Sequence, residues 1–191
     1  MTTTNIKEQA FEWLIEKALL GSTIEERGDG ADVDSQQPAE EQFYWGLPKD
    51  MDPKTAIDRR RLWSFLHATQ QEELDKYVGT QMEKEVEKQI DMDLRTFGLI
   101  HVLKNDICVQ NIKLRLFFPR PSAADAEATK EKYAANQFSV TRQQTYSLIK
   151  PGNEIDMVIF VNGLPLFTLE LKNPWTFQTA AYDGQKQYKE D

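Results

Sequence analysis

Three charged side chains stand close together near the carboxyl end of this 191-residue chain, in a segment that otherwise predicts buried β-structure. Asp156 opens a short apolar run, and Glu170 and Lys172 stand two residues apart in a later run of alternating apolar and polar residues. Asn162-Gly163, between the two runs, is the strongest short signal for a two-residue hairpin turn. Because successive side chains of a strand point to opposite faces, Glu170 and Lys172 share one face. We therefore expect two carboxylates and one ammonium group to converge on adjoining strands.

Such a cluster suits the metal-assisted hydrolysis of a phosphodiester bond. Two carboxylates supply the hard oxygen ligands that Mg²⁺ prefers, and bound Mg²⁺ activates a coordinated water and offsets charge on the phosphate. A lysine on the same face can orient or deprotonate the attacking water and pair with phosphate oxygens. The alternative is an exposed Glu–Lys pair on an edge strand, which contributes only about 0–1 kcal/mol. The aspartate, the turn and the apolar frame of both strands favour the metal site.

The residues of this segment also carry a family resemblance. Asp156, 13 intervening residues and then Glu170-Leu171-Lys172 resemble the bipartite core of the PD-(D/E)xK nucleases, and the IFVNGLPL segment between them resembles the nuclease domain of the restriction (R) subunit of type I restriction–modification enzymes. The resemblance implies a Mg²⁺-dependent DNA endonuclease. It implies that Asp156 and Glu170 bind the metal, that the Leu171 carbonyl is a candidate third ligand, and that Lys172 acts at the water.

Two positions depart from the family pattern. Ile155 stands where the name of the motif has proline, a residue that shapes the turn and does no chemistry. The R subunits also carry a Gln-x-x-x-Tyr motif on the helix after the lysine strand; Tyr188 fits the tyrosine, but Gly184 stands at the glutamine position. Gln185 is one step away, about 100° around a helix. Tyr188 and Gln185 are therefore the candidate DNA contacts.

Residues 5–20 predict an amphipathic helix that Gly21 ends. Glu8, Glu12 and Glu16 form an acidic row at i, i+4 spacing. One interpretation of this row is a solvated face. The other rests on the resemblance, which implies that a glutamate of the N-terminal helix, Glu12, contributes to the metal site. The apolar residues at helical spacing are Ile6, Ala10, Trp13, Leu14 and Ala18.

The formal net charge of −8 is unusual for a DNA-binding protein. Residues 1–53 hold 12 acidic and 4 basic residues, whereas residues 54–191 hold 19 of each, so the excess lies away from the predicted hairpin. A neutral domain has no strong grip on phosphate, which predicts weak, salt-sensitive DNA binding by this chain alone.

Other classes of protein are disfavoured by composition. No apolar run approaches the ~20 residues that cross a bilayer, and the N-terminus lacks a signal-peptide pattern. The single cysteine, Cys108, precludes an internal disulfide, fits a reducing cytoplasm and is expected to be buried. Neither histidine has a companion at metal-ligand spacing, so a zinc site is not expected.

The middle of the chain predicts a loop followed by two helices. Residues 21–53 have no clear period and predict a loop, tied down in part by Phe43, Tyr44 and Trp45. Asp52-Pro53 is a good helix start, and residues 54–78 predict a helix that is broken near Thr69. The basic run Arg59–Arg61 either contacts DNA or forms the solvated side of a helix whose aromatic residues pack inward.

Residues 80–97 predict the clearest helix. Thr80 and Glu83 resemble a capping box, and Gly98 ends the helix. Its apolar stripe is predicted to be core and consists of Met82, Val86, Ile90, Leu94 and Phe97.

From Leu99 onward the period changes to two, which predicts strands. The segment Asn136-x-Phe138-x-Val140-x-x-Gln143 again resembles the R subunit. The elements predict an α/β domain with a central mixed β-sheet flanked by helices, and the resemblance implies a restriction-endonuclease-like (PD-(D/E)xK) core in a single nuclease domain over residues 1–191. The expected elements are strands at 99–103 and 107–118 joined by a turn at 104–106, a short helix within 119–135, a strand at 138–149, the hairpin, and a helix over 179–189.

The resulting hypothesis is an endonuclease that cleaves double-stranded DNA as the nuclease part of a type I restriction enzyme. No P-loop is present, so ATP would be used by a translocase part that follows this chain in a longer subunit. The resemblance implies a cytoplasmic complex with modification and specificity subunits. Two alternatives stay open: a docking module that keeps the nuclease fold without catalysis, and a stand-alone repair or resolvase-like nuclease.

Overall fold

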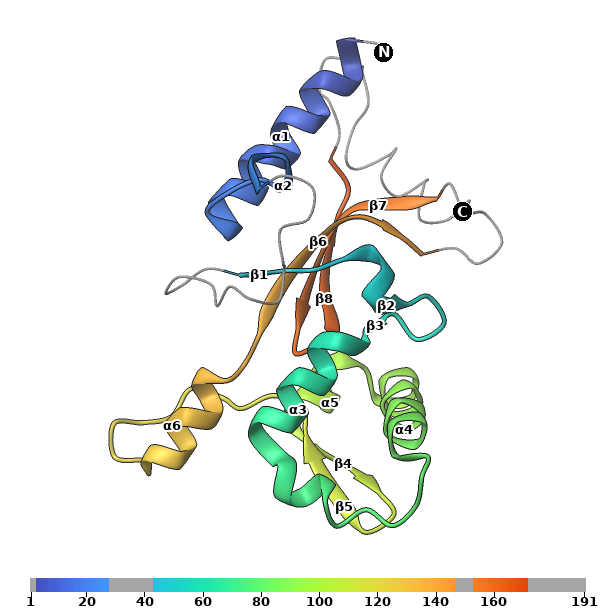
Figure 1. The fold of residues 1–191 in the computed structure, drawn as a ribbon, viewed down its shortest axis with the longest axis vertical. Coiled ribbons are helices and arrows are strands. Elements are labelled where there is room, and N and C mark those ends of the chain that lie inside the picture. Colours follow the sequence, from blue (N-terminus) through green and yellow to red (C-terminus); the bar gives the residue numbers. More distant parts are fainter. Residues whose placement is uncertain (1–2, 28–42, 147–152, 172–191) are drawn as a thin grey trace. The chain divides into compact units, whose positions relative to one another are not determined.

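A computed structural model describes residues 3–27, 43–146 and 153–171 (Figure 1). The helices are α1 (Thr3–Leu20), α2 (Ile24–Arg27), α3 (Arg59–Leu74), α4 (Met82–Phe97), α5 (Leu99–Lys104) and α6 (Glu127–Ala134), with a short 3-10 helix η1 (Pro48–Asp50). The strands are β1 (Tyr44–Trp45), β2 (Met51–Asp52), β3 (Ile57–Asp58), β4 (Asp106–Val109), β5 (Ile112–Arg115), β6 (Phe138–Thr145), β7 (Glu154–Val161) and β8 (Leu164–Leu169).

The protein belongs to the α/β class, as the sequence predicts. A four-stranded sheet has the order β1-β6-β7-β8, and β1 runs parallel to β6. Because a two-residue turn joins β7 to β8, that pair is antiparallel and the sheet is mixed. Two further sheets are two-stranded: β2 with β3, and β4 with β5.

The chain forms two compact units. Unit 1 comprises Met1–Lys49, Ser139–Ile159 and Phe167–Asp191, and unit 2 comprises Asp50–Phe138 and Phe160–Leu166. The chain therefore passes from one unit to the other within β6, β7 and β8.

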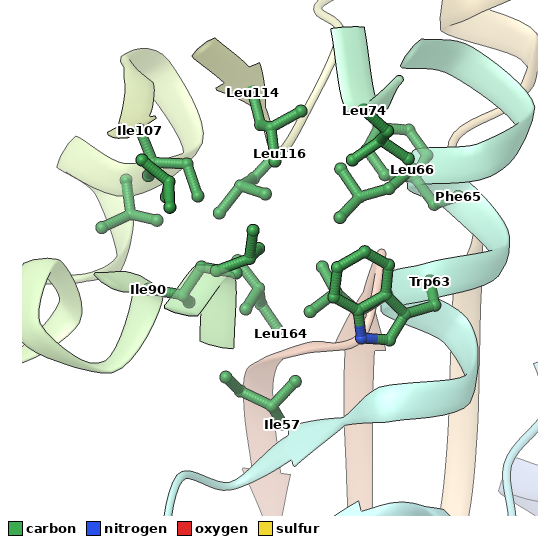
Figure 2. Close-up of a cluster of buried hydrophobic side chains, with 14 of the residues drawn as sticks. Ile57, Trp63, Phe65, Leu66, Leu74, Ile90, Ile107, Leu114, Leu116 and Leu164 are labelled. Atoms are coloured by element: carbon green, nitrogen blue, oxygen red, sulfur yellow. The ribbon is translucent and has the colours of Figure 1, made fainter. Parts of the chain in front are cut away.

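The larger apolar core lies in unit 2. Side chains from α3, α4, the β4–β5 hairpin and Leu164 of β8 point toward one another, as Figure 2 shows. α3 contributes three fully buried residues at helical spacing, Leu62, Phe65 and Leu66. Residue Gln70 interrupts α3 with non-helical angles (φ −144°, ψ 30°). There its side chain amide donates to Arg115 O (2.9 Å) and accepts from Arg115 N (2.7 Å), which ties the break to β5.

The Asn-Gly turn is buried in unit 2. Asn162 (φ 49°) and Gly163 (φ 82°) both have positive φ, as a type I′ turn requires. The Asn162 side chain is fully buried: its Oδ1 accepts from Gln137 N (2.7 Å), and its Nδ2 donates to Leu116 O (2.9 Å) and Asn136 Oδ1 (2.9 Å). The predicted hairpin is confirmed, and its tip is an internal anchor.

Unit 1 has a smaller core. Leu20 of α1, Trp45 of β1, Val140 of β6 and Met157 of β7 are buried together. Gly46 N donates to Val140 O (2.8 Å), which continues the parallel pairing of β1 with β6 beyond the strand. The expectation of a loop over residues 21–53 was wrong where α2 and β2 form. The expected anchoring by Phe43, Tyr44 and Trp45 is confirmed, because β1 pairs with β6 and Trp45 and Phe43 pack in the unit 1 core.

Two helix starts differ from the predictions. Asp52-Pro53 begins a turn, because Ala56 N donates to Asp52 O (2.7 Å) and Ala56 has φ 57°. Helix α3 begins at Arg59, where Asp58 caps Arg61 N (3.0 Å). α4 begins at Met82, and its N-cap residue makes no side-chain hydrogen bond, so the predicted capping box of Thr80 and Glu83 was wrong.

The apolar stripe of α4 is core along most of its length. Val86 and Ile90 are fully buried, and Met82 and Leu94 pack against the unit 2 core. Phe97, in the last turn, is 57% exposed, and its ring lies 4.6 Å from that of His101. The expectation of a buried Phe97 was wrong, because the helix has passed the core by its final turn.

Two predictions for the segment after Gly98 were also wrong. Residues 99–103 form α5 and not a strand, since Val102 packs into the core from a single helical turn; short apolar runs do not separate a buried strand from a buried helix. Residues 107–118 form two paired strands, β4 and β5, around Gln110 with φ 50°. Cys108 is exposed, contrary to expectation, because it lies on the outward face of β4.

Alanine at position 163 tests the buried turn. A Cβ on Gly163 would lie 2.4 Å from Asp58 O and 2.7 Å from Leu62 N, both backbone atoms, whereas a Cβ on Gly98 (φ 80°) meets nothing within 4 Å. Both alanines are strained by positive φ, which costs about 1–3 kcal/mol. We expect Gly163→Ala to lose clearly more unfolding free energy in urea than Gly98→Ala, by about 1–3 kcal/mol for the added clash. Equal losses would show that position 163 is not crowded.

Asparagine at position 58 tests the buried cap. Burial raises the pKa of Asp58 above its ordinary value of 3.8, although the hydrogen bond from Arg61 N opposes the shift, and its Oδ2 has no hydrogen-bond partner among the described residues. A raised folded-state pKa gives stability that is present below pH 3.8 and lost as the pH rises through the folded pKa. The substituted amide keeps the capping oxygen without the charge. The free energy of unfolding of Asp58→Asn, relative to that of the natural protein, should therefore increase from about pH 3.5 to about pH 7. Urea unfolding at several pH values measures this difference. A difference that is constant with pH contradicts the expectation.

Candidate functional site

The hairpin of β7 and β8 brings Asp156 to the predicted partner segment. The half-buried Asp156 carboxylate accepts a hydrogen bond through Oδ2 from Leu171 N (2.5 Å). β8 ends at Leu169, so this amide follows the strand. The bond places the Asp156 carboxylate at the peptide unit that joins Glu170 to Leu171. Glu170 is itself half-buried.

Apolar packing fixes the strand that carries Asp156. In β7 the residues after Asp156 alternate imperfectly, and Met157, Val158, Phe160 and Val161 are all buried. A slip of one residue would move each of these side chains to the opposite face of the sheet, so their packing fixes the register of the strand. The aspartate therefore stands at the polar end of a strand whose register is set by its apolar remainder.

A second polar cluster lies in unit 1, between α1 and β6. Arg142 of β6 meets three carboxylates: its Nη2 lies 2.9 Å from Glu12 Oε2, and its Nη1 lies 2.9 Å from Glu16 Oε2 and 3.2 Å from Glu25 Oε1. Glu16 is fully buried and Glu12 is 7% exposed. The interpretation of this side of α1 as a solvated face was thus wrong for these two glutamates, which point inward to the guanidinium.

Charge pairing shifts the pKa values of two members of this cluster, Arg142 and Glu25. Burial alone would lower the pKa of Arg142, but Glu16, Glu12 and Glu25 raise it overall. Partial burial alone would raise the pKa of Glu25, but hydrogen bonds from its own backbone, Trp13 and Arg142 lower it overall. Next to Arg142, Gln143 has φ 49° and interrupts the alternation of β6. A cavity of ≈ 400 Å³ opens beside the cluster and is lined by Glu16, Glu25, Trp45, Gly46, Leu47, Pro48, Arg142, Gln143, Thr145 and Glu154.

Glu12 does not join the hairpin carboxylates in the described part of the chain. Within residues 3–27, 43–146 and 153–171, no group of three or more acidic, histidine or cysteine side chains is arranged to hold a metal ion. The role of Glu12 as a metal ligand stays a prediction. Sequence reasoning missed Arg142, and no signal in the sequence singles it out, because its partners come from α1 and α2.

The arginine run at the start of α3 is used within unit 2. Arg59 Nε pairs with Glu87 Oε1 (2.8 Å), Arg60 Nε pairs with Asp50 Oδ2 (2.7 Å), and Arg61 is only 5% exposed. The predicted inward packing of the aromatic residues of this helix is confirmed for Trp63 and Phe65, which are buried in the core. The expectation of solvated arginines is confirmed for Arg59, which is exposed although it pairs with Glu87. It was wrong for Arg61, which is buried, and Arg60 is half-buried and paired with Asp50.

Residues 49–191 of the chain match the family model described as "Type I restriction enzyme R protein N terminus (HSDR_N)". The chain belongs to this family. The matched range includes the whole hairpin and the segment from Lys172 onward, and it leaves out α1, α2 and β1. No curated protein and no solved structure matches the chain.

Several residues expected at the site of this R-protein domain lie outside the described residues. These are the candidate catalytic residue Lys172, the candidate DNA contacts Gln185 and Tyr188, and Gly184, together with the helix expected over residues 179–189. Their roles stay predictions. Among the described residues, no helix is long and apolar enough to span a membrane.

Removing the guanidinium of Arg142 tests the cluster of the R-protein domain. Arg142→Met would leave Glu12 and Glu16 buried without their cation, and breaking a buried pair from one side costs about 3–5 kcal/mol of unfolding free energy. The matched control is Arg95→Met, which breaks the exposed pair of Arg95 with Asp91 and should cost no more than about 1 kcal/mol. Urea unfolding measures both; equal costs would mean that the cluster adds nothing to stability.

Proposed function

We propose that this R-protein domain cleaves double-stranded DNA in a Mg²⁺-dependent reaction. One observation carries the proposal: the Asp156 carboxylate lies at the Glu170–Leu171 peptide, 2.5 Å from Leu171 N. Two acids on consecutive strands thus stand at one end of a hairpin, in a chain whose family is that of type I restriction enzyme R proteins. The restriction-endonuclease-like (PD-(D/E)xK) core is part of the proposal.

The donor set of this hairpin end suits Mg²⁺. Asp156 and Glu170 offer carboxylate oxygens and Leu171 offers a backbone carbonyl, which are the hard ligands that Mg²⁺ prefers. Among the described residues, Asp156 makes no hydrogen bond besides that to Leu171 N, so its Oδ1 is open to a ligand. The bound cation would supply an activated water and offset phosphate charge.

The remaining work falls to the residues of the chain. The Leu171 N–H holds one oxygen of Asp156 and so orients the other toward a ligand. Lys172 would orient the attacking water and pair with a phosphate oxygen. Tyr188 and Gln185 would contact the DNA.

Affinity for DNA would come mainly from the larger enzyme. Residues 54–191 hold equal numbers of acidic and basic residues, and the Arg59–Arg61 run is paired or buried. Proteins that neutralise few phosphates bind DNA weakly. We propose that modification and specificity subunits recruit the DNA and that a translocase part of the subunit uses ATP.

A docking module without catalysis is the second candidate. The pairing of Glu12 with Arg142 favours it, because a carboxylate engaged by a guanidinium is a poorer metal ligand. The two candidates differ in whether Asp156 must be ionised.

Asparagine at position 156 separates the two candidates. Asp156→Asn keeps an oxygen that can accept from Leu171 N and removes only the charge, so the hairpin should fold normally. We expect calorimetric binding of Mn²⁺ to be lost, and DNA cleavage by the assembled enzyme to fall at least about 100-fold with ATP hydrolysis intact. Glu170→Ala and Lys172→Ala should also abolish cleavage.

The control for this test is Glu154→Gln, an exposed acid on the same strand, which should leave Mn²⁺ binding and cleavage unchanged. If Asp156→Asn cleaves as well as Glu154→Gln does, the catalytic proposal is wrong and the docking module is favoured.

A further inference from the structure

Helix α1 places apolar side chains on its outer surface. Phe11 is 51% exposed, Leu14 67% and Trp13 36%, and Ala10 is exposed beside them. Residues 10, 11 and 14 share one face of a helix, since each residue turns the helix by about 100°. Ala10, Trp13 and Leu14, which recur at helical spacing in the sequence, thus lie on the outer side of the helix.

The opposite face of α1 is already filled. Ile15, Leu19 and Leu20 pack in the unit 1 core, and Glu12 and Glu16 bind Arg142 next to them. The helix therefore cannot rotate to bury Phe11 and Leu14 without drawing two ion-paired glutamates away from the guanidinium. Breaking that buried pairing is strongly unfavourable.

A hollow accompanies the exposed face. It has a volume of ≈ 550 Å³ and lies between residues of α1 and the segment from Thr23 to Glu26. An ion pair links the two helices there: Lys17 Nζ of α1 lies 2.6 Å from Glu26 Oε1 of α2. The hollow is lined by Ala10, Trp13, Leu14, Lys17, Thr23, Glu25 and Glu26. The apolar side chains of one helix could enter it in the manner of a helix in a groove.

The charges around the hollow select the partner. Glu26 pairs with Lys17 and Glu25 pairs with Arg142, but Arg142 also binds Glu12 and Glu16, so four carboxylates face two cations there. DNA and anionic membranes would be repelled by this excess of negative charge. A polypeptide with lysine or arginine beside its apolar stripe would be attracted.

We propose that the outer face of α1 and the hollow beside α2 form a docking surface for a basic amphipathic helix of a partner protein. This surface lies outside the range that matches the R-protein family, and it involves none of the hairpin residues. The inference is independent of the proposed nuclease activity, because neither the metal nor DNA takes part in it.

A designed peptide pair tests the surface on the 191-residue chain. The first peptide is an 18-residue helix (about five turns) made of leucine at i, i+3, i+4 and i+7 and lysine elsewhere; its twin carries glutamate in place of lysine. We expect calorimetry to give a Kd on the order of 10⁻⁶ M for the lysine peptide. The Kd of the glutamate peptide should be larger by about tenfold or more.

Leu14→Asp distinguishes a docked helix from simple charge attraction. This change adds negative charge, so charge attraction alone would strengthen binding of the lysine peptide; docking of an apolar stripe predicts a loss of about tenfold or more. Leu14 is largely exposed, so the fold should survive, which circular dichroism and the urea midpoint check. Ile100→Asp, at a site on α5 that is 62% exposed, is the matched control and should leave binding unchanged.

Two results would overturn the inference. The first is equal binding of the lysine peptide to the Leu14→Asp and Ile100→Asp variants. The second is a concentration-dependent dimer in analytical ultracentrifugation that Leu14→Asp dissolves, because the face would then be covered by a second copy of the chain.

Discussion

A buried asparagine at the tip of the β7–β8 hairpin is the constraint on which the candidate site depends. Asn162 is held by its side chain inside unit 2, with bonds to Gln137, Leu116 and Asn136. Gly163 next to it has no room for a Cβ. A turn held this firmly sets the hairpin register, and a slip of one residue would move every side chain of a strand to the other face. The position of Asp156, on β7 beside the end of β8, therefore depends on the turn as well as on the hydrogen bond from Leu171 N.

The two polar clusters of unit 1 differ in the groups that bind their carboxylates. At Arg142, one guanidinium binds three carboxylates, in a place where Glu16 is fully buried. Such an arrangement is costly to break from one side. At Asp156, a half-buried carboxylate accepts a hydrogen bond from a backbone amide through one of its oxygens.

The ion pairs of Arg142 with Glu12 and Glu16 also explain why α1 exposes an apolar face. Because Glu12 and Glu16 are engaged on the inner side, Phe11 and Leu14 have no alternative but the surface. The N-terminal helix lies outside the matched family range and the hairpin lies inside it. The two proposals assign docking of a partner to the helix and phosphate chemistry to the hairpin.

The sequence by itself determined the hairpin and its turn type, because these depend on residues adjacent in the chain: alternation, an Asn-Gly pair and a short apolar run. It also determined the α/β class and the position of most helices. It did not determine which face of α1 is inside, because apolar residues lie on both faces and only the partner Arg142, 130 residues away from Glu12, decides between them. Residues 99–103 became a helix, and Arg61 of α3 became buried, for the same reason. Local pattern fixes what a segment can form, and long-range pairing, which the tertiary structure alone supplies, fixes which side of it is buried.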